Sequence, residues 1–148
     1  MKYKLEIEID LPREKVIELF DNPDNLKHWQ EGFVSFEPKS GVSGQVGAKS
    51  HLKYKMGKRD VEMVETITKR NLPDEFSGTY ETKGMWNEVK NFFYEVGPNK
   101  TKWVSENEFR ASGAMKLFSL LMPGMFKRQS YKYMVDFKNF AEKLDDLP

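Results

Sequence analysis

Apolar side chains near the end of the chain recur at the spacing of a helix. Steps of three, four and seven residues place them on one face. The residues of this face are Phe126, Tyr133, Phe137, Phe140 and Leu144. The pattern predicts one long amphipathic helix over about 114–144, and such a helix must bury its apolar face against the rest of the fold.

Most of the chain before this helix alternates apolar and polar residues, which is the pattern of strands with one buried face. In the first such stretch, Tyr3, Leu5, Ile7 and Ile9 alternate with charged residues. About six more strands are predicted in the same way, over about 33–38, 48–56, 61–67, 76–80, 85–96 and 101–111. Short turns between consecutive strands indicate a curved antiparallel sheet. Two short helices are expected between the first strand and the second.

Pro123-Gly124 interrupts the pattern of the predicted last helix. Proline removes a backbone donor and clashes with the preceding turn, so the helix should kink or break there. The apolar run Leu117–Met122 comes just before this point, and it is too short to cross a bilayer, which takes about 20 apolar residues. Three interpretations stay open: a movable lip over a cavity, a kink that wraps the helix around the sheet, or two packed helices.

The composition bounds the class of protein. A chain of 148 residues without linker or repeat predicts a single domain over 1–148, of the α+β class. It has no cysteine, and its N-terminus lacks the continuous apolar stretch of a signal peptide, so we expect a cytoplasmic protein. The net charge of +1 predicts no long-range attraction to nucleic acid or to an anionic membrane.

The sequence indicates neither a metal nor a cofactor. His28 and His51 are the only histidines, and their spacing is not that of a metal pair. Gly41, Gly44 and Gly47 recur at every third residue, which indicates turns and not a phosphate-binding loop. We therefore expect a monomer or weak homodimer that has no cofactor, no metal, no transmembrane segment and no nucleic-acid partner.

The order of the predicted elements and the opening of the chain resemble a known superfamily. The first strand leads into Leu11-Pro12 and a helix that ends in Phe20, then into Asp21-Asn22-Pro23, Leu26 and Trp29. This pattern is similar to the helix-grip fold of the START and birch-pollen-allergen-like superfamily, in particular its polyketide cyclase/dehydrase branch, often called SRPBCC. The resemblance implies a curved antiparallel sheet that grips the last helix, with a cavity between them. Members bind lipids, sterols, polyketides, plant hormones or other hydrophobic molecules, and a minority are enzymes. The shared markers concern the fold, so they transfer no catalytic residue to this chain.

Polar side chains fall on strand faces that the alternation turns inward. Ser105 and Asn107 share a face with Trp103, Asn91 faces inward on the preceding strand, and Glu65 is in phase with apolar residues. An unpaired buried amide or hydroxyl costs about 1–3 kcal/mol, and a lone carboxylate costs more. These groups therefore indicate a cavity that holds water or a ligand. A place for Glu65 at a strand bulge or sheet edge stays an alternative, as do hydrogen bonds from the other groups to neighbouring loops.

Aromatic and flexible side chains complete the predicted ligand site. Methionine adapts to varied partners, and half of the 8 methionines lie in the last helical segment. The residues that we expect to line the cavity are Tyr54, Met63, Glu65, Phe76, Tyr80, Asn91, Trp103, Ser105, Asn107, Met122, Met125, Phe126 and Tyr133. For the three tyrosines, a place in the core with a satisfied hydroxyl is the alternative.

Three functions fit these features. The first is the binding, for carriage or sensing, of a small hydrophobic molecule such as a lipid or a polyketide-like compound between the sheet and the last helix. The second is an enzyme of the cyclase or dehydratase kind, in which Glu65 or a tyrosine acts as acid or base. The third is an interaction domain that docks a partner or a second copy through Leu117–Met122.

Overall fold

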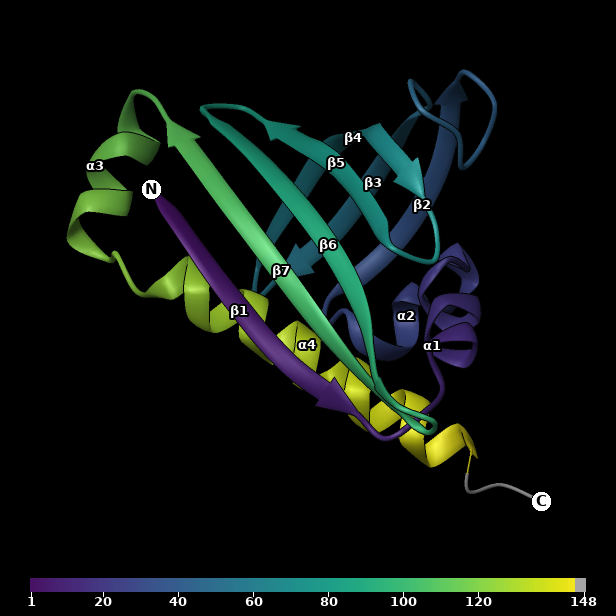
Figure 1. The fold of residues 1–148 in the computed structure, drawn as a ribbon. Helices are drawn as coiled ribbons and strands as arrows, with labels where there is room; N and C mark the ends of the chain where they lie inside the picture. Colours follow the sequence, from purple (N-terminus) through teal and green to yellow (C-terminus); the bar gives the residue numbers. More distant parts are fainter. Residues whose placement is uncertain (146–148) are drawn as a thin grey trace.

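A computed structural model describes residues 1–145 as a curved sheet that wraps around a long helix (Figure 1). The sheet has seven antiparallel strands in the order β1-β7-β6-β5-β4-β3-β2. The strands are β1 (Lys2–Ile9), β2 (Phe33–Ser40), β3 (Lys49–Met56), β4 (Arg59–Asn71), β5 (Glu75–Thr82), β6 (Met85–Gly97) and β7 (Lys100–Ala111). The helices are α1 (Arg13–Phe20), the 3₁₀ turn η1 (Pro23–Asn25), α2 (Leu26–Trp29), α3 (Ala114–Leu121) and α4 (Met125–Asp145). This architecture confirms the predicted α+β helix-grip fold.

The expected interruption at Pro123-Gly124 is a complete break, so the predicted long helix is two helices. The chain forms α3, leaves helical geometry at Met122 and begins α4 at Met125. Pro123 lies in the gap, where its missing N–H costs no helical hydrogen bond. The two helices differ in burial, because Met134, Phe137 and Ala141 of α4 are buried whereas α3 has no buried residue. Of the predicted apolar face, Phe137 is buried and Phe126, Tyr133 and Phe140 are partly buried, whereas the expected burial of Leu144 is wrong because this residue is exposed near the end of α4.

The dry core lies at one end of the sheet, under α1 and α2. Its buried residues come from β1, α1, α2, β6, β7 and α4 and the loop before α1: Leu5, Ile9, Leu11, Val16, Leu19, Trp29, Phe93, Trp103, Met134, Phe137 and Ala141. The ring of Phe20 packs edge-on against Phe93, Trp103 and Phe137 at centroid distances of 5.0, 5.5 and 6.0 Å. We call this set of buried residues the dry core below.

The concave face at the other end of the sheet is only partly covered. The register places Glu65, Tyr80, Asn87 and Phe109 directly opposite one another on β4, β5, β6 and β7, so they share one face. The ring of Phe109 stacks on Phe126 of α4 at 4.7 Å, which shows that this face looks toward the helix. All four side chains are nevertheless partly exposed. We call this row and the inward residues beside it, Met63 and Val89, the open concave face.

Candidate functional site

A carboxyl group and a phenol are paired on the open concave face. The Tyr80 hydroxyl donates a hydrogen bond of 2.8 Å to Oε2 of Glu65. Partial burial raises the pKa of Glu65, and the hydrogen bond from Tyr80 opposes that rise. Burial and the neighbouring Glu65 both raise the pKa of Tyr80 well above its ordinary value, so Tyr80 keeps its proton and donates. The alternative of a solvated Glu65 at a sheet edge is thus wrong, because Glu65 lies inward on a central strand.

Two further tyrosines lie close to this pair. Burial is the main cause that raises the pKa of Tyr54 on β3, and the charges of Tyr133 and Glu65 add to it. The Tyr54 hydroxyl donates to Oε1 of Gln30 at 2.6 Å. Burial also raises the pKa of Tyr133 on α4. The fold thus places Tyr80 of β5 and Tyr54 of β3 near the Glu65 carboxyl group, and Tyr133 of α4 near Tyr54, all of them predicted site residues.

Ser105 and Asn107 face inward on β7, as the alternation predicts, and both are buried. The Asn107 side chain donates to the Ser105 hydroxyl at 2.9 Å, so these two groups satisfy each other. Tyr3 lies directly opposite Asn107 on β1, and its hydroxyl is 2.7 Å from the Ser130 hydroxyl of α4. Burial raises the pKa of Tyr3 to about 12. Tyr3 thus links β1 to α4 next to the Ser105–Asn107 pair of β7.

Asn91 pairs with Trp103, a residue of the dry core. Nε1 of Trp103 donates to Oδ1 of Asn91 at 2.9 Å. Trp103 is 3% exposed and Asn91 is 5% exposed. Phe76, directly opposite Asn91 on β5, packs edge-on against Phe20 at 6.0 Å. The structure therefore separates these three predicted residues from the group around Glu65, and their contact with a ligand stays a prediction.

The predicted residues of the last helical segment are also divided. Met63 on β4, Met125 and Phe126 are partly buried, and Phe126 covers Phe109 of the concave face. Met122 lies in the break between α3 and α4 and is exposed. Only the apolar side chains that face the sheet are therefore placed to contact a molecule on the concave face.

Sequence reasoning missed one donor beside this site. Nε1 of Trp29 is buried and has no hydrogen-bond partner among the described residues 1–145. The indole packs edge-on against Tyr133 at 6.5 Å and against Phe137 at 5.2 Å, so it borders both the tyrosine group and the dry core. Most buried polar groups in proteins find a partner, so this N–H is available to an acceptor. In the sequence, Trp29 is an apolar residue of a predicted helix, and nothing there distinguishes it from an ordinary core residue.

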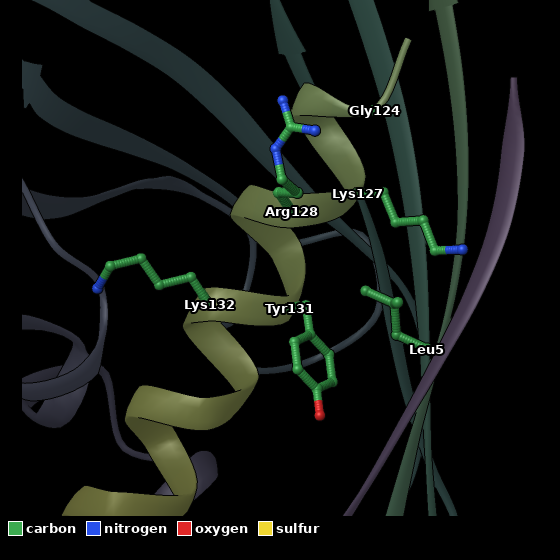
Figure 2. Close-up of a pocket in the computed structure, with 6 residues that line it drawn as sticks. All are labelled: Leu5, Gly124, Lys127, Arg128, Tyr131 and Lys132. Atoms are coloured by element: carbon green, nitrogen blue, oxygen red, sulfur yellow. The ribbon is translucent and has the colours of Figure 1, made fainter.

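A separate hollow of about 460 Å³ opens on the outer side of α4 (Figure 2). Lys127, Arg128, Tyr131 and Lys132 of α4 line it, and Leu5 lies at its strand side. It contains none of the polar residues around Glu65, so it is distinct from the concave face. Within residues 1–145, no group of His, Asp or Glu side chains has the arrangement of a metal site.

Comparison with known proteins shows the fold. The sequence matches no model of a protein family and no curated protein. A conserved protein from Geobacillus kaustophilus is similar in structure with a TM-score of 0.80 at 14% identity, over 97% of this chain and 96% of that chain. The Zhui aromatase/cyclase from Streptomyces sp. R1128 gives 0.78 at 11% identity, over 97% and 94%. Norcoclaurine synthase from Thalictrum flavum, in complex with dopamine and hydroxybenzaldehyde, gives 0.73 at 12% identity, over 100% and 88%. These likenesses show the helix-grip fold, which the resemblance of the sequence predicts.

Proposed function

We propose that the protein binds a small hydrophobic molecule with at least one polar group on the open concave face. The observation that carries this proposal is the row Glu65, Tyr80, Asn87 and Phe109, which faces α4 and yet stays partly exposed. A face that is concave, mostly apolar and equipped with a few directed polar groups is the usual form of a small-molecule site.

The side chains on this face are expected to contact two different parts of the ligand. Met63, Val89, Phe109 and Phe126 offer apolar contacts for its body. The Glu65 carboxyl group accepts hydrogen bonds, so it favours a hydroxyl or amine on the ligand. A molecule that displaces water here gains apolar burial and keeps these polar groups satisfied.

The unpartnered indole of Trp29 supports the same ligand class. Its buried N–H would be satisfied by a carbonyl or hydroxyl oxygen of a bound molecule. The structural neighbours are consistent with the proposal at the level of the fold, since norcoclaurine synthase holds dopamine and hydroxybenzaldehyde, both small aromatic molecules. At 12% identity that likeness assigns no residue here.

A fluorescent binding assay with a neutral probe, N-phenyl-1-naphthylamine, tests the proposal. Val89→Trp fills space on the concave face, whereas Lys90→Trp adds the same side chain on the outer face of β6. We expect Val89→Trp to weaken probe binding at least about tenfold and Lys90→Trp to leave it unchanged. Thermal unfolding of both variants checks that each is folded. Equal binding by the two variants would show that the probe occupies another surface and would contradict the proposal.

A second candidate function is an enzyme that uses Glu65 as acid or base. The raised pKa of Glu65 and its direct bond to Tyr80 favour it, because catalytic acids and bases are tuned in this way. Native mass spectrometry with solvent extraction would identify a compound that co-purifies with the protein. If the protein converts that compound and Glu65→Gln slows conversion at least about a hundredfold, the enzyme candidate stands. A compound that is recovered unchanged after prolonged incubation leaves binding alone.

A further inference from the structure

Helix α3 presents apolar side chains to solvent. Leu117, Leu120 and Leu121 are 61%, 71% and 71% exposed, and Phe118 and Met122 are exposed as well. The helix projects from the end of β7, away from the main body of the fold (Figure 1). Its contacts are few: Met115 lies against Gly84, and the Phe118 ring meets Phe126 edge-on at 6.4 Å. A contiguous apolar patch of this kind is unusual on a surface that faces only water.

The charged residues in the sequence around this patch all have one sign. From Phe109 to Val135 the sequence contains no Asp and no Glu. The cations of this stretch are Arg110, Lys116, Lys127, Arg128 and Lys132. Arg110 is paired with Glu108, and Lys132 is paired with Glu31 and Asp136. Within residues 1–145, the other three cations form no ion pair with a described residue.

The unpaired cations lie next to the exposed apolar side chains. Lys116 belongs to α3, and Lys127 and Arg128 belong to the first turn of α4. The Arg128 guanidinium lies beside Gly124, at the junction of the two helices (Figure 2). The hollow on the outer side of α4 opens at the same place, and Lys127, Arg128 and Lys132 line it mainly with the apolar parts of their side chains.

We propose that α3 and the first turn of α4 dock this protein reversibly onto an anionic membrane surface. Leu117, Leu120 and Leu121 enter the interface between headgroups and acyl chains, and the flanking cations contact lipid phosphates. Across residues 1–145, no helix is long and apolar enough to span a bilayer, so the association is peripheral. The proposal does not depend on a ligand on the concave face.

Charge complementarity favours a lipid surface over a second copy of the chain. In a two-fold dimer the same patch meets itself, so the cations Lys116, Lys127 and Arg128 of one copy would come close to the cations of the other. An anionic bilayer supplies the opposite charge and an apolar layer at once. The net charge of +1 does not oppose this, because the attraction acts within about 10 Å, the Debye length at about 0.1 M salt.

Co-sedimentation with vesicles tests the proposal. The full chain is mixed with vesicles of pure phosphatidylcholine, or of equal parts phosphatidylcholine and phosphatidylglycerol. We expect binding to the anionic vesicles only, and loss of that binding at about 1 M salt, where the Debye length is about 3 Å. Leu120→Gln/Leu121→Gln should weaken binding at least about tenfold, because both side chains lose their transfer into the apolar layer. Gel filtration of the same variants checks that each is folded and monomeric.

Matched control variants test whether binding depends on this surface or on exposed apolar side chains and net charge anywhere on the protein. Val42→Gln/Val46→Gln removes exposed apolar side chains from the loop between β2 and β3, where they are 73% and 62% exposed. Each exchange of a cation for glutamate lowers the net charge by two, so Lys127→Glu/Arg128→Glu and Lys53→Glu/Lys55→Glu both change it from +1 to −3. We expect only the first of these charge variants to lose binding, and we expect the valine variant to bind as the parent does.

Three outcomes would overturn the proposal. One is the absence of binding to anionic vesicles. Another is equal loss of binding in the test and control variants, which would mean that net charge alone decides. The last is a dimer that persists on dilution and that Leu120→Gln/Leu121→Gln dissociates, which would assign α3 to a second copy of the chain.

Discussion

The same two strands bury their inward side chains very differently at their two ends. Phe93 and Trp103, directly opposite each other on β6 and β7, are 1% and 3% exposed. Asn87 and Phe109 are also directly opposite, on the same face of the same strands, and both are partly exposed. The difference lies in what covers the sheet, because α1, α2 and the later turns of α4 pack over the first pair.

This contrast shows that the strand pattern sets which residues face inward, whereas the covering helices determine which of these residues are shielded from solvent. The break at Pro123 turns α3 away from the sheet, so one stretch of the concave face keeps only the start of α4 over it. The stabilising core and the proposed binding face thereby lie at different ends of one sheet, and substitutions at the two ends should have unequal effects.

The largest difference is expected between two phenylalanines of the last helical segment. Phe137 is fully buried in the dry core, so Phe137→Ala should lower the free energy of unfolding by about 3–5 kcal/mol. Phe118 is exposed on α3, so Phe118→Ala should cost less than about 1 kcal/mol. Urea unfolding followed by far-ultraviolet circular dichroism measures both. Similar losses would mean that the two ends are packed alike.

A smaller difference is expected between two asparagines of β6. Asn91→Leu leaves the buried Trp103 N–H without its acceptor and should cost about 1–3 kcal/mol. Asn87 lies on the same face at the open end, where water can replace its hydrogen bond to the Glu108 carbonyl, so Asn87→Leu should cost less than about 1 kcal/mol. Urea unfolding compares them, and an equal cost would show that water does not reach Asn87.

The fold was predictable because its signals are local. The strand predicted over 101–111 is β7 (Lys100–Ala111), and that over 85–96 is β6 (Met85–Gly97). Alternation along a strand depends only on neighbouring residues, and the interruption at Pro123 follows from the chemistry of proline itself. These features need no knowledge of the tertiary structure.

The environments of the site residues could not be predicted in the same way. Asn91 and Glu65 look alike in the sequence, since each is a polar residue on an inward face. Asn91 pairs with Trp103 of the dry core, and Glu65 pairs with Tyr80 on the open concave face. The difference depends on the angle at which α4 crosses the sheet, which no local pattern contains. The exposure of α3 likewise depends on the direction that the chain takes after residue 111.

The pH dependence of stability should show whether the Glu65 carboxyl group is buried. Burial raises the pKa of Glu65 in the folded protein, so the folded state binds its proton more tightly than the unfolded state does. Stability should therefore fall as the pH rises from the ordinary value of 4.5 through the raised value. Glu65→Gln should remove this fall, keep an acceptor for Tyr80, and make the variant more stable than the parent at neutral pH. The two proteins should be equally stable below the ordinary value.

Thermal unfolding across that pH range measures the effect. Glu62→Gln is the matched control, because Glu62 is exposed on the opposite face of the same strand and forms an exposed ion pair with Lys53 at 3.6 Å. The control should follow the parent at each pH. If Glu65→Gln also follows the parent, the carboxyl group of Glu65 is solvated and the open concave face has no buried acid.

The smallest effect on the free energy of unfolding is expected for the exposed leucines of α3. Leu120→Gln/Leu121→Gln replaces side chains that solvent already surrounds, and glutamine is as good a helix former as leucine, so the free energy of unfolding should change by less than about 0.5 kcal/mol. Leu19→Gln makes the same exchange in the dry core, where an amide would lose its water, and should cost more than about 2 kcal/mol. Urea unfolding measures both. A large loss in the α3 variant would mean that α3 packs against the sheet in solution, which would close the open concave face and remove the surface proposed to meet the membrane.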